Sequence, residues 1–399
     1  MNWLKTQFQP VDNSPLILFR ICFGLLIFLE SFGATLTGWV NTALIEPTFN
    51  FTLIGLEWLQ PLDGPWMYIY FYAMALCGLM VMFGFYYKAG MAGFTILWTL
   101  VYWMQKSHYN NHYYLLILLC VFMLIVPAHA YASYDSKRWN SVVSTTCPKW
   151  CINIFILQMW IVFTFAALHK IYPGWLNGDF IGMNFKAKSD YWLIGELLQK
   201  DWLQQMVIYG GIFFDGLIVY FLLWKKTRKA AFIIAAFFHL FNSAVFHIGI
   251  FPYLMIALMV FFFEPETIRR TFFRKKPIVQ LQKNLPNLTP SCLVLVGIFG
   301  LYFALQIYLP LRNHLYKGDV FYTEEGHRLS WRMMLRSRSG YARWTVTTED
   351  GIVHYINVRD YVSKKQYSTL MHTPDVMWQL AQRIKQEYNQ KGHDIVIIN

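Results

Sequence analysis

Long apolar stretches fill the first three quarters of the chain, separated by short polar or aromatic turns. A helix needs about 20 apolar residues to cross the hydrocarbon core of a bilayer. About nine stretches meet or approach that length, and the third and eighth are short. They lie near residues 15–34, 66–87, 90–106, 113–132, 151–169, 206–224, 229–247, 250–264 and 291–310. The pattern predicts an α-helical polytopic membrane protein with about nine transmembrane helices.

The last quarter of the chain has a different pattern. Residues 341–361 alternate between apolar and polar positions around Glu-Asp-Gly, which is typical of a β-hairpin. Residues 374–392 have helical spacing and end at Gly392, and the C-terminal "HDIVIIN" has the composition of a strand. We therefore expect a transmembrane helical domain over residues 1–310 and a small extracytoplasmic α+β domain over residues 311–399.

Composition and charge agree with a membrane location. Hydrophobic residues make up 56% of the chain and charged residues 14%, against about 25% charged residues in soluble domains. In a soluble protein the net charge of +12 would suggest nucleic acid, but here Lys and Arg gather in alternate loops. Lys137, Arg138, "KKTRK" and "IRRTFFRKK" lie on one side. The positive-inside rule then places the N-terminus in the cytoplasm, and we expect no nucleic-acid partner.

The cysteines give little support to a metal site. The six cysteines are scattered, and Cys147 and Cys151 form a C-x₃-C pair without a second pair nearby. A structural zinc ion requires four ligands. We therefore expect the four cysteines in or beside apolar runs to be packing residues and the protein to need no metal.

Several polar residues occur at the predicted outer ends of different helices. Lys170 ends the fifth span, and "NNHYYL" places Asn111 and His112 at the start of the fourth. His239 and Asn242 share one face of the seventh span. Polar groups at membrane depth are costly unless they face one another or a cavity. The arrangement therefore indicates a shared pocket that opens to the outside.

Each of these residues also has an ordinary structural interpretation. A lysine such as Lys170 at the end of a span is usually an anchor that extends its charge into water. His112 could cap its helix, and the polar pair of the seventh span could join neighbouring helices. Asp215 and Arg20, each within a span, could form a structural ion pair. The residues alone leave these alternatives open.

Four motifs together point to a family. "NNHYYL", "ALHKIYPGWLNGD", "FHLFNSAVFHIGIFPYLM" and "LSWRMMLRSRSG" occur in this order. They resemble the vitamin K-dependent γ-glutamyl carboxylase family, including its bacterial members with the horizontally transferred transmembrane (HTTM) domain. The similarity runs from about Phe19 to about Tyr361. It implies a carboxylase of the carbon–carbon lyase type, which oxidises a quinol to its epoxide with O₂ and adds CO₂ to a peptide glutamate.

The resemblance implies roles for individual residues. Lys170 falls on the family's catalytic lysine, the second of a basic pair whose first member is His169 here. His112 belongs to the family's Asn-His motif and is the second catalytic candidate. Arg336 stands where the animal enzyme has a histidine, so its role is not transferred. The candidates for binding the cofactor are Asn111, His239, Asn242, Trp331, Met334 and Arg338.

The chemistry of the family explains why a lysine would end a membrane helix. A base must remove a proton from the quinol hydroxyl, and burial among apolar helices disfavours the ammonium form of Lys170. We expect the free amine of Lys170 to act as this base. His112 would orient it or hydrogen-bond the quinol, and Asn111 would hold an oxygen. The isoprenoid tail needs an apolar slot between helices, which the many Phe, Trp and Met residues can provide.

The expected cofactor is reduced vitamin K, as phylloquinol or menaquinol, with O₂ and CO₂ as co-substrates. The expected partners are a peptide or protein glutamate, the quinone and membrane lipid, in a bacterial inner membrane. The animal enzyme continues beyond the region that matches "HDIVIIN", so quinol oxidation has stronger support than peptide carboxylation. Two alternatives stay open. One is a quinol-oxidising enzyme on the same scaffold without protein carboxylation, and the other is a non-enzymatic quinone- or lipid-binding membrane protein.

Overall fold

The computed structural model describes residues 2–246, 248–279, 285–333, 335, 340–392 and 395–398 of the chain. The chain forms two compact units. Unit 1 consists of Met1–Glu30, Met74–Thr95 and Asn111–Arg336, and unit 2 of Ser31–Ala73, Ile96–Asn110 and Ser337–Asn399. The units combine segments that are distant in the sequence. The domain boundary between residues 310 and 311 stays a prediction.

Every predicted apolar stretch contains a helix. These helices are α2 (Ser14–Leu36), α3 (Pro65–Phe83), α4 (Tyr87–Met104), α5 (Asn111–Ile125), α7 (Trp150–Leu168), α11 (Asp201–Leu223), α12 (Arg228–Phe246), α13 (Phe251–Leu258) and α15 (Pro290–Leu311). Their apolar composition leaves no alternative to helix, because a helix satisfies all backbone hydrogen bonds within one segment. The predicted α-helical membrane fold is confirmed.

The number of spans is smaller than predicted. In the part of the chain that the structure describes, six helices are long and apolar enough to cross a membrane: α2, α3, α7, α11, α12 and α15 with its extension to Leu315. A seventh span is possible if α13 and the 3₁₀ helix η4 (Met259–Phe262) are counted with α14 (Pro265–Phe272), which is bent from them by 113°. Nine spans are therefore not confirmed.

A proline explains one of the shortened segments. Helix α5 ends at Ile125, just before Pro127, and is too short to span by itself. The predicted eighth stretch ends at residue 264, and Pro265 directly after it begins the bent helix α14. Proline lacks an N–H group and disfavours helical backbone in the residue before it. Hydropathy alone does not register this backbone effect.

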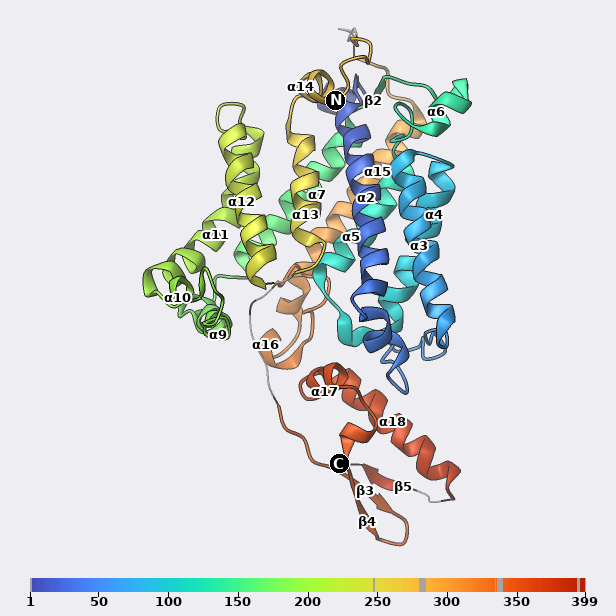
Figure 1. Ribbon diagram of the computed structural model, residues 1–399, viewed down its shortest axis with the longest axis vertical. Coiled ribbons are helices and arrows are strands. Elements are labelled where there is room, and N and C mark those ends of the chain that lie inside the picture. Colours follow the sequence, from blue (N-terminus) through green and yellow to red (C-terminus); the bar gives the residue numbers. More distant parts are fainter. Residues whose placement is uncertain are drawn as a thin grey trace. The chain divides into compact units, whose positions relative to one another are not determined.

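The shorter elements of unit 1 lie at its two ends. Helices α6 (Tyr134–Arg138) and α14 and strand β2 (Thr146–Pro148) are at the end that holds the N-terminus, and α9 (Asp179–Lys186), α10 (Gly195–Leu198) and α16 (Val320–Thr323) are at the other (Figure 1). The remaining short elements are α1 (Asn2–Gln7), β1 (Pro10–Asp12), α8 (Pro173–Leu176), η3 (Asn140–Val142) and η5 (Arg312–Leu315). Strands β1 and β2 pair antiparallel.

The core of unit 1 is aromatic. Phe155 of α7 stacks on Phe261 of η4 with ring centroids 4.4 Å apart, and Phe19 of α2 lies 5.3 and 5.0 Å from these two rings. At the N-terminal end, the buried Lys276 donates to Asp12 Oδ1 at 2.6 Å. The aromatic contacts and this ion pair together hold α2 against α7 and the segment after α14.

Unit 2 contains the predicted α+β elements. Strands β3 (Trp344–Thr348), β4 (Val353–Ile356) and β5 (Ile395–Ile398) form an antiparallel sheet in the order β4-β3-β5. The β3–β4 turn contains Gly351 at φ +79°, as the Glu-Asp-Gly signal predicts. The sheet packs with α17 (Lys364–Leu370) and α18 (Pro374–Gln390). The predicted hairpin, helix and C-terminal strand are confirmed.

The loop between α2 and α3 is part of unit 2. This loop includes the π-helix η1 (Asn41–Ile45), and η2 (Lys106–His108) and η6 (Val358–Asp360) are the other short helices of the unit. Phe51 of the loop is fully buried among Val346, Leu370 and Leu380. Lys106 forms a 2.6 Å ion pair with Asp375 at the start of α18. The apolar loop residues thus complete the core of the C-terminal α+β fold.

A close contact between α2 and α3 gives a test of the fold. A Cβ atom at Gly24 would clash with the backbone nitrogen of Met82, whereas a Cβ at Gly33 meets nothing within 4 Å. Gly24→Ala is expected to lower the free energy of unfolding by about 1–3 kcal/mol, because the helices must separate. Gly33→Ala, on the same helix, is expected to be neutral or stabilising by up to about 1 kcal/mol. Thermal unfolding in one detergent compares them, and equal stability of the two variants would contradict the helix contact.

Candidate functional site

Lys170 forms a buried ion pair just after the end of α7. Its Nζ atom pairs with Oδ2 of Asp215, which lies within α11, and the two side chains are 12% and 7% exposed. The same Nζ atom lies 5.3 Å from the ring centroid of Trp175. The lysine therefore does not extend into bulk water, as an interfacial anchor would.

Local sequence explains where the lysine lies. Helix α7 ends at Leu168, and the lysine amide still donates to the carbonyl of Ala167 at 3.1 Å. The backbone then becomes extended at Tyr172, and Pro173 begins α8. Lys170 is thus held in the turn that directly follows α7, a helix that lies side by side with α11.

The ion pair changes the electrostatic argument for a catalytic amine. The sequence argument considered only burial of Lys170, and the structure adds a carboxylate partner, Asp215, next to the amine. The interpretation of Asp215 and Arg20 as a structural pair is wrong. Arg20 instead donates to the carbonyl oxygens of Ala132 at 2.7 Å and of Ala128 at 3.3 Å.

His239 is a buried histidine without a hydrogen bond. It is 1% exposed, and neither ring nitrogen has a hydrogen-bond partner within the described part of the chain. The ring centroids of Phe238, Phe214, Phe251 and Phe163 lie 5.5, 5.8, 6.1 and 6.2 Å away. A neutral imidazole has one donor and one acceptor, and leaving them unpaired costs about 1–3 kcal/mol each. The position is therefore suited to a bound polar group inside an aromatic shell.

Phe251 brings His112 and His239 together. Its ring centroid lies 5.5 Å from that of His112 and 6.1 Å from that of His239. Asn242, one turn after His239 on α12, is half-buried. Phe214 is next to Asp215 in α11, so the aromatic shell of His239 adjoins the ion pair. These candidates from α5, α11, α12 and α13 therefore belong to one region of unit 1.

The segment after α16 contributes a second set of candidates. Asn111, which is 4% exposed, donates to the carbonyl of Arg332 at 2.8 Å. Trp331 is buried and stacks on Tyr114 with ring centroids 5.1 Å apart. Burial lowers the pKa of Arg332, whose guanidinium lies 5.5 Å from the ring of Phe321. The predicted residues Met334 and Arg338, like Arg336, lie outside the described residues.

Trp331 has an unusual backbone conformation. Its φ is +59°, in the left-handed region, and its indole Nε1 has no hydrogen-bond partner within the described residues. A non-glycine residue in this region costs about 1–3 kcal/mol and persists only where the surroundings impose it. The Asn111 bond to the next carbonyl and the stacking on Tyr114 are such constraints.

His169, the residue before the candidate base, is not a second cation. Burial, and then the nearby Arg332 and His314, lower the pKa of His169 to about 3. The imidazole is therefore neutral at pH 7. Where the resemblance places two adjacent lysines, this protein has one lysine and one neutral ring.

Sequence reasoning missed Asp215 as the partner of Lys170. A carboxylate inside a long apolar helix was a visible signal, because ionisable groups within membrane spans are expensive and usually functional. The identity of its partner was not visible, since it depends on which helices lie next to each other. The stacking of Tyr172 on Phe321, 4.4 Å between centroids, was likewise unpredictable.

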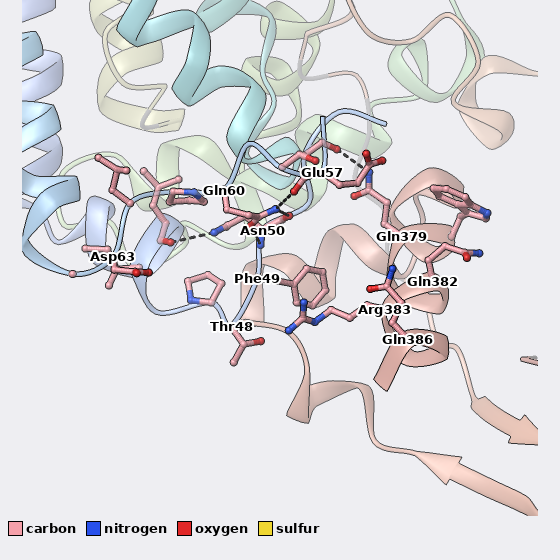
Figure 2. Close-up of a pocket in the computed structure, with 18 residues that line it drawn as sticks. Thr48, Phe49, Asn50, Glu57, Gln60, Asp63, Gln379, Gln382, Arg383 and Gln386 are labelled. Atoms are coloured by element: carbon pink, nitrogen blue, oxygen red, sulfur yellow. Dashed lines mark hydrogen bonds between the residues drawn. The ribbon is translucent and has the colours of Figure 1, made fainter. Parts of the chain in front are cut away.

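Unit 2 has a polar cavity of about 730 Å³ (Figure 2). It is lined by the α2–α3 loop and by α18. Gln60 accepts from the amide of Asn50 at 3.0 Å, and Gln379 donates to the carbonyl of Thr52 at 2.9 Å. Gln382 and Gln386 line the same cavity and are exposed. The lining is rich in amide groups that both donate and accept hydrogen bonds.

Two family models match the chain. The HTTM domain matches residues 8–266, and the vitamin K-dependent gamma-carboxylase lumenal domain matches residues 292–399. The chain belongs to the vitamin K-dependent γ-glutamyl carboxylase family. No solved structure matches it. Membership of the carboxylase family implies enzyme activity, dependence on vitamin K, a protein substrate and membrane association. The lumenal-domain match supports an extracytoplasmic C-terminus for this carboxylase-family protein.

The buried ion pair gives a stability test in this carboxylase-family protein. Removing one partner leaves an uncompensated buried charge, so Lys170→Met and Asp215→Leu should each lower the free energy of unfolding by about 3–5 kcal/mol. The double variant should recover most of that loss, because both charges are gone. Thermal unfolding of the four proteins in detergent gives the coupling. Strictly additive losses would show that the two side chains do not interact.

Proposed function

We propose that this protein is a vitamin K-dependent γ-glutamyl carboxylase-like enzyme of a bacterial inner membrane. It oxidises a reduced naphthoquinone to its epoxide with O₂ and couples this to the addition of CO₂ to a peptide glutamate. The observation that supports it most is the buried ion pair of Lys170, the residue whose motif resembles the family's catalytic lysine. We place the N-terminus in the cytoplasm and Lys170 near the outer face.

The residues around His239 fit a reduced naphthoquinone. Aromatic rings favour stacking on a flat fused ring, and the unpaired nitrogens of His239 and Trp331 suit its two hydroxyl groups. His239, Asn242 and Trp331 would therefore hold the quinol. When bound, the quinol supplies the reducing equivalents and, on oxidation by O₂, the base that removes the γ-proton of glutamate.

Side chains of the protein would transfer the quinol proton and exclude water from the site. In the ion pair Lys170 already carries its proton, so it would first pass that proton to Asp215 and then, as the free amine, take the quinol proton at Nζ. A poorly hydrated site favours this neutral form of the pair over two separated charges. Asn111 fixes the segment that carries Trp331, through the Arg332 carbonyl. The phenylalanines around His239 exclude water, which protects reactive species from side reactions.

The glutamate-bearing peptide is the proposed second substrate, and the unit 2 cavity is its proposed docking site. Ligand sites commonly have volumes of about 300–1,000 Å³, and this cavity falls within that range. An extended peptide is recognised chiefly through its backbone amides. Gln379, Gln382 and Gln386 present side chains that match those groups.

The proposed reaction has a direct test. Purified protein is incubated with phylloquinol or menaquinol, O₂, labelled CO₂ and a glutamate peptide, and epoxide and labelled peptide are measured. Lys170→Ala should lower epoxide formation at least about 100-fold, because the proton acceptor is lost. Lys186→Ala, an exposed lysine of the same region, should retain activity. The Lys170→Ala/Asp215→Ala double variant should be equally inactive, which separates loss of the base from the instability of an unpaired carboxylate.

The outcomes distinguish the three candidate functions. Both products together support the carboxylase. Epoxide without labelled peptide supports the quinol-oxidising enzyme. Quinone binding without either product supports the non-enzymatic protein. Equal epoxide from wild type and Lys170→Ala would remove Lys170 from the mechanism.

The peptide site is tested by a matched pair of substitutions on α18. Gln386 lines the cavity, and Gln390, one turn further on, is exposed and lies outside it. Gln386→Leu should raise the KM for peptide about fivefold, the effect of one lost hydrogen bond of about 1 kcal/mol. The KM for quinol should not change. A Gln390→Leu variant with the same increase would show that the cavity has no special part in peptide binding.

A further inference from the structure

A second cavity, in unit 1, lies apart from the residues assigned to quinol and peptide. It has a volume of about 1080 Å³ and is lined by residues of α2, α3 and the segment 131–143. Its size is at the upper end of common ligand sites, about 1,000 Å³. Helix α6, which contributes to it, is at the end of unit 1 that holds the N-terminus (Figure 1).

One wall of this cavity is a continuous apolar face. Leu76, Leu79, Met80 and Phe83 line it with the i, i+3, i+4 and i+7 spacing of one face of α3. At 1.5 Å per residue the face is about 10 Å long. Leu76 and Phe83 are each 60% exposed, so the wall is open to the surroundings of the helix. A hydrocarbon chain is the ligand that such an open apolar strip suits.

The opposite wall is polar and cationic. Arg20, Ser136 and Lys137 line it, and Lys137 is exposed. Arg20 is 1% exposed, and its Nε atom has no hydrogen-bond partner within the described residues. No acidic side chain is among the described residues that line the cavity. The nearby Asp135 accepts from the amides of Tyr86 and Tyr87 at 2.8 Å. Its negative charge also acts on Arg20, so the exposed Lys137 contributes most of the net positive charge at the cavity.

We propose that this cavity binds an anionic glycerophospholipid. The acyl chain lies along α3, and the phosphate is at Ser136 and Lys137, with the buried charge of Arg20 behind them. Two cations and no lining carboxylate complement a headgroup of net negative charge. A zwitterionic headgroup carries its own cation and is held less well. The cavity is at the predicted cytoplasmic end, where juxtamembrane Lys and Arg attract anionic lipids. This site is independent of the quinol chemistry.

The test measures binding of palmitoyl-oleoyl phosphatidylglycerol to the full-length protein in detergent by native mass spectrometry. Phosphatidylcholine with the same chains and soluble glycerol 3-phosphate are the comparison ligands. The wild type should prefer phosphatidylglycerol about fivefold or more over phosphatidylcholine. Glycerol 3-phosphate should not compete. Equal affinity for the two lipids, or competition by glycerol 3-phosphate at equal concentration, would overturn the proposal.

Two adjacent cations provide the matched variants. Lys137 lines the cavity, whereas Arg138 does not; the Arg138 guanidinium lies 5.1 Å from the ring of Trp139 and 5.6 Å from that of Tyr86. Lys137→Gln should weaken phosphatidylglycerol binding about fivefold, and Arg138→Gln less than about twofold. An equal loss in both would mean that only the general surface charge attracts the lipid, which contradicts a built site.

A matched pair of tryptophan substitutions on α3 tests the apolar wall. Leu79→Trp narrows the strip on α3, and Ile69→Trp places the same side chain on an exposed part of that helix outside the cavity. Leu79→Trp should lower binding of both lipids at least about threefold, whereas Ile69→Trp should not. Thermal unfolding without lipid shows that each variant is folded. Unchanged binding by a folded Leu79→Trp protein would exclude α3 as the acyl-chain site.

Discussion

The ion pair between Lys170 and Asp215 is the interaction on which the organisation of unit 1 depends. Two charges in a poorly hydrated place are tolerable only together, because their mutual attraction offsets part of the desolvation cost. That requirement holds the end of α7 against the middle of α11. In the proposed mechanism Asp215 is both the counter-ion of Lys170 and the acceptor of its proton. A lysine anchored in water would need neither, and its charge would be screened.

Buried polar side chains of unit 1 differ in how well their hydrogen-bonding atoms are satisfied. Lys276 at the N-terminal end has three oxygen partners at 2.6–2.9 Å. His239 has none within the described residues, and Trp331 combines an unpaired nitrogen with a left-handed backbone. Departures of this kind lower stability and are expected where a protein reserves groups for a ligand. The stability that these residues give up is offset by the aromatic packing around them.

The two units carry different proposed roles. We propose proton transfer and quinol binding for unit 1, and peptide docking for the amide-lined cavity of unit 2, which lies between a loop and a helix of distant sequence position. The α2–α3 loop belongs to unit 2 because Phe51 is buried in its core and neighbouring residues bond to α17 and α18. A proton-transfer site must exclude water, whereas a peptide site must admit backbone amides.

The sequence by itself determined the helices, the β-hairpin and the motif residues, because apolar length, turn chemistry and short motifs are local properties. It overestimated one span where Pro127 interrupts an apolar run, since hydropathy ignores backbone hydrogen bonding. Only the tertiary structure decided that Asp215 pairs with Lys170 and that Arg20 bonds backbone carbonyls. It also decided that Phe51 enters the core of the C-terminal sheet. These depend on which helices are neighbours and how they are rotated, and a one-dimensional pattern of apolar residues leaves both undetermined.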